Sequence, residues 1–361
     1  MKEIKVMVNG LPGNMSTKAA EHIVKTPGFT LIPYSFTGPE ITQKTCSVED
    51  VKIELITPEN KEKGIDKIIK EYEPFITSEF IRIPKDQVGK SIGNIDFYIK
   101  HNLPFITGTV GLDIDAVESR IKKSNIVGLA APNMAIQIVA FQNFMTNIAM
   151  KYEGKVKTGE FYALESHQES KGEETSGTMK AIVPNFQKIG VQYSLDDIIK
   201  IRKWDEQREL GVPETAKQGH GWHVYILYTP QENFVTYKIA EEISDYFLAL
   251  DKNKVFFDYD LFDYPPKDSE VITNLKFVEQ KIGKPKLFRN ISIESYRVAK
   301  DDTVSFSVLY DPLNLVAITH NVNGRDIYAK GNLNGIQFLH EKITKGKKGK
   351  LYRMTDAIKS P

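Results

Sequence analysis

The chain has 361 residues, which is long enough for two domains with a large buried core. Its 48 lysine and arginine residues nearly balance its 47 aspartate and glutamate residues, so no overall charge attracts nucleic acid or a membrane surface. No apolar run approaches the roughly 20 residues that span a bilayer. A single cysteine, Cys46, excludes an internal disulfide and indicates a reducing compartment.

The N-terminal residues pass directly into a strand pattern, Ile4 to Val8, so we expect no signal or transit peptide and a cytoplasmic protein. A glycine-bearing turn and a helix from Thr17 to Lys25 follow. A strand, a glycine turn and a helix, in this order, form the loop that cradles a dinucleotide pyrophosphate. The alternative is an ordinary turn without a ligand. The residues of the turn are Gly10, Leu11, Pro12, Gly13, Asn14, Met15 and Ser16.

Within this turn, Gly10 suits the tight bend and Gly13 suits a close approach of backbone to phosphate, whereas Ser16 replaces the usual third glycine. The predicted next strand, Phe29 to Phe36, ends where NAD-preferring folds often carry an acid for the ribose hydroxyls. No acid occurs there before Glu40. The missing carboxylate leaves room for a 2′-phosphate, which favours NADPH or dual use of NADPH and NADH.

Strand and helix patterns then alternate as far as Tyr152. Parallel strands joined by helices bind ligands at the carboxyl ends of the strands. Two predicted strands end in small-residue turns of that kind, at Gly108-Thr109-Val110 and at Ala131-Pro132-Asn133-Met134. The alternation predicts a Rossmann-type doubly wound parallel sheet. Its further strands are expected at 53–56, 74–77, 103–107 and 126–131, and its helices at 64–72, 94–102 and 135–152.

After Gly154 a predicted strand, Gly159 to Leu164, delivers a polar stretch to a sheet edge. His167 lies four residues before Lys171, and Ser176-Gly177-Thr178 leads into a helix with Pro184 inside it. A histidine transfers protons near neutral pH, a lysine supplies positive charge, and a helix start with hydroxyls binds anions. The stretch suits a small carboxylate substrate that is protonated as it reacts. The alternative is a polar surface loop that holds one histidine.

His220 and His223 form an H-x-x-H pair before a predicted strand at 224–228. No third ligand is evident and the helical zinc motif H-E-x-x-H is absent, so we predict a strand edge along a cleft and no bound metal. The later elements are expected as helices at 235–250, 271–282 and 333–343 and strands at 291–298, 303–310 and 317–322. The aromatic, acidic run 256–264 is read as packing core, and the basic run 345–350 as a solvated loop.

Together these motifs resemble the signature of the 4-hydroxy-tetrahydrodipicolinate reductase family of lysine biosynthesis. The specific block is Glu165-Ser166-His167-Gln168, then Lys171, then Ser176-Gly177-Thr178, and glutamine after the histidine is similar to the plant-type branch. The other matching stretches are V-N-G-L-P-G-N-M, T-G-T-V-G, A-P-N-M and I-T-H-N-V-N-G-R, the last at 318–325. The resemblance covers about residues 1–228 and 301–358.

The resemblance implies a dinucleotide-binding domain at 1–131 and 326–361 and a substrate domain at 132–325. The latter is expected as an open mixed sheet with helices on one side. An unrecognised insertion falls at about 229–300. His167 would donate and accept the proton and Lys171 would be the second catalytic group. Gln168, Ser176, Gly177 and Thr178 would bind substrate. The cofactor residues would be the turns 10–15, 108–110 and 131–134; His320 and Arg325 would have supporting roles.

The resemblance also implies the reaction. NADPH or NADH would reduce a cyclic, conjugated imine dicarboxylate, with loss of water, and the protein would be a homo-oligomer, a dimer or a tetramer. Two departures stand out: Ser16 for a glycine, and Val110 where many members have threonine. Two alternatives stay open. They are a reductase of another cyclic imine or unsaturated carboxylate, and a non-catalytic NADPH-binding regulator, against which the presence of both His167 and Lys171 speaks.

Overall fold

The computed structural model describes residues 3–229, 234–250, 254–258, 275–285, 287–288, 292–297, 304–311 and 315–358. The chain divides into two compact units. Unit 1 runs from the N-terminus to Val139 and resumes at Arg325, and unit 2 runs from Ala140 to Gly324. The sequence places the first boundary at residue 131 and the second at 325. Among the described residues, no helix combines the length and the apolar character that a membrane span requires.

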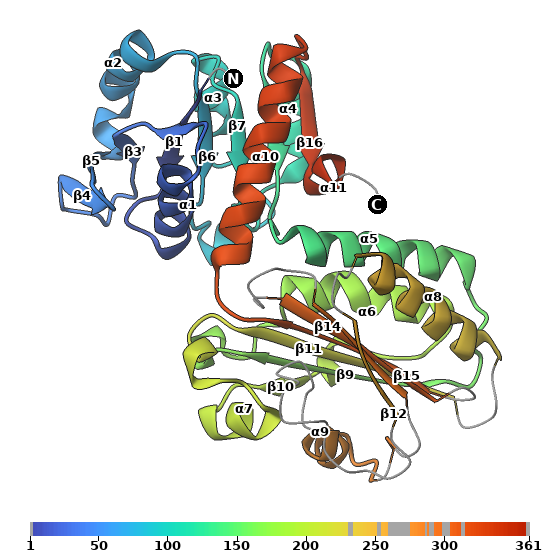
Figure 1. The fold of residues 1–361 in the computed structure, drawn as a ribbon. Coiled ribbons are helices and arrows are strands. Elements are labelled where there is room, and N and C mark those ends of the chain that lie inside the picture. Colours follow the sequence, from blue (N-terminus) through green and yellow to red (C-terminus); the bar gives the residue numbers. More distant parts are fainter. Residues whose placement is uncertain are drawn as a thin grey trace. The chain divides into compact units, whose positions relative to one another are not determined.

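Unit 1 is built on a six-stranded sheet in which every pairing is parallel (Figure 1). The strand order, β16-β8-β7-β6-β1-β2, puts β1 between two strands that follow it in the chain. Successive strands are therefore added on opposite sides of β1, and such a switch point is where these sheets bind ligands. The strands are β1 (Ile4–Asn9), β2 (Phe29–Leu31), β6 (Ile76–Glu79), β7 (Phe105–Thr107), β8 (Val127–Ala130) and β16 (Lys350–Arg353).

Helices cover both faces of this sheet because β1 is apolar on both sides. Val6 and Val8 pack in one cluster with Ile23 and Ile336, whereas Met7 packs in a second cluster with Val117. These clusters place α1 and α10 on one face and α4 on the other, which confirms the doubly wound sheet. The helices are α1 (Asn14–Lys25), α2 (Lys61–Tyr72), α3 (Ile95–Lys100), α4 (Ile114–Lys122), α10 (Asp326–Thr344) and α11 (Met354–Ala357).

Two sequence predictions in unit 1 are wrong. The expected single strand from Phe29 to Phe36 is two strands, because Pro33 has no N–H for a ladder. β2 pairs with β1, whereas β3 (Tyr34–Phe36) joins β4 (Thr45–Val48) and β5 (Val51–Ile56) in a small separate sheet. The basic run was expected to be solvated loop throughout, but Lys350 begins β16, which Gly349 positions by donating its N–H to Ile126 O at 2.8 Å.

Unit 2 is built on a seven-stranded sheet of order β10-β9-β11-β15-β14-β13-β12. Only β10 and β9 pair in parallel, so the sheet is mixed, as expected. The strands are β9 (Glu160–His167), β10 (Ile199–Ile201), β11 (Gly221–Tyr228), β12 (Lys254–Asp258), β13 (Ser292–Arg297), β14 (Val304–Asp311) and β15 (Leu315–Val322). The predicted insertion at 229–300 contains β12 and β13, which widen the sheet; the rest of the run 256–264 lies outside the described residues.

Helices lie on both faces of the unit 2 sheet, not on one side as the resemblance implied. Phe141 and Phe186 approach Tyr225, which points from β11 toward α5 (Ile136–Lys151) and α6 (Gly177–Ile189). Trp222 points the other way and packs with Leu210 and Phe277. These last two residues belong to α7 (Trp204–Leu210) and α9 (Leu275–Ile282), whereas α8 (Phe234–Leu250) lies with α5 and α6 (Figure 1).

Candidate functional site

A row of polar side chains crosses the middle of the unit 2 sheet. Strand register places Glu165 of β9 opposite His223 of β11, and His223 opposite His320 of β15. Paired residues point to the same face of a sheet, and so does His167, two residues beyond Glu165. Gly221 lies opposite His167, and a Cβ there would meet the imidazole at 3.0 Å. The register therefore gathers three imidazoles and a carboxylate on the face that α5, α6 and α8 cover.

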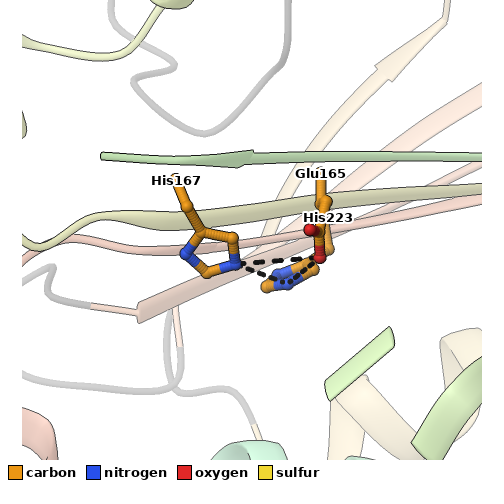
Figure 2. A group of neighbouring side chains, drawn as sticks. All are labelled: Glu165, His167 and His223. Carbon is orange, nitrogen blue, oxygen red and sulfur yellow. Dashed lines mark hydrogen bonds and ion pairs between the residues drawn. The ribbon is translucent and has the colours of Figure 1, made fainter. Parts of the chain in front are cut away.

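Contacts fix how the His167 ring is oriented. Its Nδ1 lies 3.2 Å from the carbonyl oxygen of His220, and its Nε2 lies 3.3 Å from Nε2 of His223 (Figure 2). A carbonyl only accepts, so the neutral ring carries its hydrogen on Nδ1 and presents a lone pair at Nε2. The His167 side chain is 17% exposed and that of His223 is 3% exposed. His167 is thus the imidazole of this pair that a solute reaches more easily.

Burial lowers the pKa of His167 to about 4, and the charges of Lys171 and Arg202 act in the same direction, against the opposing effect of Glu165. Burial likewise lowers the pKa of His320 to about 3 and holds that of His223 well below its usual value. At neutral pH the rings are uncharged. His167 can therefore accept a proton, and it donates one when a neighbouring negative charge stabilises its charged form.

Glu165 is fully buried yet ionised. Burial alone raises the pKa of this carboxyl. Hydrogen bonds from Ser176 and Arg202, together with the charge of His167 when that ring is protonated, hold the pKa below its usual value. Arg202 Nη2 lies 2.5 Å from Oε1, and the Ser176 N–H donates to Oε2 at 3.0 Å. Arg202 also donates to the carbonyls of Gly172 and Glu174, at 2.7 and 3.2 Å. The buried pair thus anchors the loop that joins β9 to α6.

The predicted substrate residues lie along this loop and at the start of α6. Ser176 is the N-cap and accepts the N–H of Met179 at 3.1 Å, while the N–H groups of Gly177 and Thr178 have no helical carbonyl to bind. A Cβ at Gly177 would meet nothing within 4 Å, so space is open there. This helix start is an anion-binding position, as the sequence predicted.

Gln168 precedes the short turn Glu169–Lys171 and Lys171 ends it; both side chains are half-buried. Burial is the main cause that lowers the pKa of His167 and of His223, and the Lys171 charge acts in the same direction on both rings. Gln207 Nε2 donates to the His167 carbonyl at 2.8 Å and holds the end of β9 in place. The structure therefore gathers the predicted catalytic pair and the helix start around one end of β9.

The predicted cofactor turn follows β1 in unit 1. Gly10 has φ of +96°, and a Cβ there would approach the Phe80 carbonyl oxygen to 2.3 Å, so the turn accepts only glycine. The next helix, α1, begins after Gly13 with no side-chain cap and no acid in its first turn. Its N–H groups are free to bind an anion such as a pyrophosphate. Ser16, in place of the usual glycine, bonds through Oγ to the Asn9 carbonyl at 3.2 Å.

A cavity of about 490 Å³ opens beside this turn. Its wall includes Gly10, Gly13, Thr37, Glu40, Lys61 and Arg82. Two cationic side chains and one carboxylate thus border the place where a dinucleotide ribose would lie.

The other two predicted cofactor turns lie at the same edge of the sheet, after β7 and β8. Thr109 Oγ1 accepts the N–H of Ile81 at 3.2 Å, whereas Val110 is 68% exposed. Asn133 Oδ1 accepts the N–H of Ala135 at 3.0 Å, and Met134 is buried close to Gly108. Neither turn lines the 490 Å³ cavity. All three predicted turns therefore share one edge, but only the first forms that cavity.

The sequence pattern assigns no role to Glu165, Arg202 or His223. It paired His223 with His220, but the two rings diverge: His220 Nε2 lies 2.9 Å from Ser166 Oγ, and His220 Nδ1 lies 3.2 Å from Ala216 O. The available signal was the two-residue spacing of Glu165 and His167 in β9 and of His223 and Tyr225 in β11, which places each pair on one face of its strand. It became informative only with the strand register, which the sequence does not contain.

Known proteins resemble this chain along nearly its whole length, although no protein-family model matches it. A probable 4-hydroxy-tetrahydrodipicolinate reductase 2, chloroplastic, of Oryza sativa subsp. japonica is 26% identical over 355 residues, which are 98% of this chain and 82% of the rice protein. The 4-hydroxy-tetrahydrodipicolinate reductase 2, chloroplastic, of Arabidopsis thaliana is 27% identical over 357 residues, 99% and 77% of the two chains. Along nearly its whole length, this chain is therefore similar to curated 4-hydroxy-tetrahydrodipicolinate reductases.

Two solved structures align with this chain, each at 11% sequence identity. One is a dipicolinate-bound dihydrodipicolinate reductase from Paenisporosarcina sp. TG-14, which covers 97% of both chains with a TM-score of 0.48. The other is an aspartate semialdehyde dehydrogenase II complexed with ASA from Vibrio cholerae, which covers 94% of this chain and 99% of its own with a TM-score of 0.45.

Proposed function

We propose that this protein reduces 4-hydroxy-tetrahydrodipicolinate to tetrahydrodipicolinate with NADPH or NADH, as a step of lysine (diaminopimelate) biosynthesis. The observation that carries the proposal is the neutral, half-buried His167. Its Nε2 lies 3.3 Å from Nε2 of His223, which in turn contacts Ser176, the N-cap of α6. A proton-transfer group, a cation and an anion-binding helix start are the groups that reduction of an unsaturated dicarboxylate requires.

His167 and Lys171 have complementary roles in this proposal. A bound nicotinamide cofactor would supply the hydride. Loss of water leaves the ring conjugated, and the electron pair that arrives with the hydride leaves the ring electron-rich until it takes up a proton. The Lys171 ammonium stabilises that charge, and it also lowers the pKa of the neighbouring imidazole. A negative charge on the substrate opposes this effect, so His167 gains a proton when substrate binds and delivers it from Nε2 to the neighbouring carbon.

One substrate carboxylate binds the N–H groups of Gly177 and Thr178 and the Thr178 hydroxyl, with Gln168 as a further donor. Helix α6 has 13 residues, so its N-terminus carries a partial positive charge that favours an anion. Ser176 contributes indirectly, because its hydroxyl already caps the helix and lies 3.0 Å from His223 Nε2.

The turns at 10–15, 108–110 and 131–134 hold the cofactor in this proposal. The uncapped start of α1 binds the pyrophosphate, and the 490 Å³ cavity receives the adenosine half. Lys61 and Arg82 border this cavity and favour a 2′-phosphate, whereas Glu40 favours free ribose hydroxyls. Both cofactors are therefore proposed, with comparison of their kcat/KM values as the measurement that ranks them.

The test is a turnover assay. Purified protein is mixed with NADPH and the freshly made condensation product of pyruvate and aspartate semialdehyde, and absorbance of the reduced cofactor is followed. We expect turnover in the wild type and its near-complete loss in His167→Gln and in Lys171→Ala, with cofactor binding retained. His101→Gln is the matched control, because His101 pairs with Glu62 in unit 1 and belongs to neither predicted site.

Cofactor binding without turnover by the wild type would overturn the assignment. Turnover of a different cyclic imine or unsaturated carboxylate would then identify a related reductase, and no turnover of any would favour a regulator. A dimer or tetramer and a cytoplasmic location complete the proposal. The plant relatives are named chloroplastic, so the compartment is checked by locating the tagged protein in its own cells.

A further inference from the structure

Three side chains on the unit 2 sheet offer metal-binding atoms to one point. Glu165 Oε2 lies 3.9 Å from Nε2 of His167 and 3.9 Å from Nε2 of His223, and the two nitrogens are 3.3 Å apart. Figure 2 shows the carboxylate and both rings converging from two neighbouring strands. We infer that Glu165, His167 and His223 form a binding site for a divalent transition metal, with Zn²⁺ as its best occupant.

The spacing of the three atoms matches zinc. The point equidistant from all three atoms lies about 2.2 Å from each of them, close to the Zn–N and Zn–O bond lengths of about 2.0–2.2 Å. Ligands at such bond lengths lie about 3.4 Å apart around a tetrahedral ion. The observed separations need only a few tenths of an ångström of adjustment. Two histidines and one glutamate, with a fourth position for water or solute, is also a ligand set that zinc accepts.

The surrounding contacts prepare these atoms as ligands. The His220 carbonyl holds the hydrogen of His167 on Nδ1, which leaves Nε2 as a lone pair directed at the site. Arg202 occupies the other oxygen of Glu165, so Oε2 is presented as a single fixed ligand. His223 has a buried Nδ1 without a hydrogen-bond partner. A hydrogen on that atom would be unsatisfied, so in the metal-free protein the hydrogen lies on Nε2, between the two rings.

Zinc would occupy the space of the hydrogen between His167 and His223. When Nε2 of His223 binds the ion, the hydrogen of the neutral ring moves to Nδ1, so no proton is released. The ion also engages the lone pair that the proposed reductase uses. Zinc should therefore inhibit the reductase. That inhibition rests on the proposed function, whereas metal binding itself does not.

The site is tested first without substrate. Zn²⁺ is titrated into the intact protein in competition with a chromogenic chelator, and Co²⁺ is added separately to record its visible ligand-field bands. We expect one tight site, and cobalt bands typical of four-coordinate nitrogen and oxygen ligation. His167→Gln and His223→Gln should each weaken zinc binding by more than the roughly 10–100-fold that loss of an outer hydrogen bond costs.

His220→Gln is the matched control, because His220 is buried beside the cluster but directs its ring to Ser166 and Ala216. It should keep the zinc affinity within a few-fold, and circular dichroism checks the fold of every variant. Zinc affinity that is equal in the wild type and both ligand variants, or cobalt bands typical of six aqueous ligands, would overturn the site.

A second measurement separates this inference from the proposed reductase. Equimolar Zn²⁺ should abolish turnover of the wild type, and excess EDTA should restore it. Turnover that continues with the site saturated would overturn inhibition. If the protein binds zinc but shows no turnover, the metal site is supported and the reductase assignment is contradicted. If it shows turnover but binds no zinc, the reductase assignment is supported and the metal site is contradicted.

Discussion

Uncharged imidazoles are the unusual feature of this protein at the scale of single residues. His223 and His320 stack with ring centroids 4.3 Å apart, and His320 Nε2 contacts the Tyr225 hydroxyl at 3.2 Å. Charging the buried His320 ring would place a cation among Phe141 and Phe306. The cost of that charge is why burial lowers the pKa of His320 to about 3.

This pKa predicts a pH dependence of stability. Unfolded His320 titrates near pH 6.5, so between pH 6.5 and about 3 the unfolded state binds a proton that the folded state refuses. Stability from this residue is therefore complete above pH 6.5 and is lost as pH falls. In His320→Phe, we expect the fall in unfolding free energy from pH 6.5 to 5 to shrink by about 2 kcal/mol. Urea denaturation at both pH values measures it; parallel curves for variant and wild type would contradict it.

Single residues were predictable from the sequence only where the motif was local. His167, Lys171 and Ser176 lie within ten residues, and the structure gathers them at one end of β9. Arg202 and His223 were not predicted, because they reach the same place only when β10 and β11 pair with β9. Pairing partners depend on the whole sheet, and a one-residue shift of register would turn His223 to the opposite face.

At the scale of elements, helix α6 joins folding to ligand binding through one hydroxyl. Ser176 caps the helix and contacts His223, so Ser176→Ala should cost about 1 kcal/mol of stability and raise KM for the dicarboxylate. Ser194→Ala is the control. Ser194 caps a short helical turn at Leu195–Asp197 in the same unit and should cost stability without changing KM. Urea denaturation and steady-state kinetics give both numbers; an equal effect on KM would contradict the role of Ser176.

The turn after β1 was predicted from its glycines, and its geometry gives a sharper test. Gly10 and Gly28 have nearly the same positive φ, +96° and +90°, but a Cβ at Gly28 meets nothing within 4 Å. Both alanine variants should lose about 1–2 kcal/mol through left-handed backbone strain. Only Gly10→Ala also collides with the Phe80 carbonyl, so only it should abolish binding of NADPH, measured by fluorescence titration. Equal NADPH affinities in the two variants would show that the turn is not the cofactor loop.

At the scale of the whole molecule, the sequence predicted that one sheet is parallel and the other mixed. It did not predict the strand at the edge of the parallel sheet. Alternating strand and helix patterns gave the parallel sheet because each pattern is local. The edge strand β16 was missed, since it follows α10 after a run of lysines and pairs with β8 from more than 200 residues earlier. Three hydrophobic clusters of described residues each draw their residues from one unit, two from unit 1 and one from unit 2. Each unit therefore has a core of its own.

Separate cores predict separate unfolding, and one glycine can test this. In unit 1, a Cβ on Gly331 of α10 would lie 1.6 Å from the Met134 carbonyl oxygen. The clash should cost at least about 2 kcal/mol, which exceeds the roughly 1 kcal/mol that alanine gains in a helix. Both tryptophans of the chain, Trp204 and Trp222, belong to unit 2, so their fluorescence reports that unit alone.

In urea, Gly331→Ala should move the circular dichroism transition to lower concentration and leave the midpoint of tryptophan fluorescence in place. Asn334→Ala is the control, because Asn334 is exposed on the same helix and should move neither signal appreciably. If both signals shift together in Gly331→Ala, the two cores unfold as one cooperative body. The stability measured for any variant would then belong to the whole chain, since loss of the core in unit 1 would carry the histidine row of unit 2 with it.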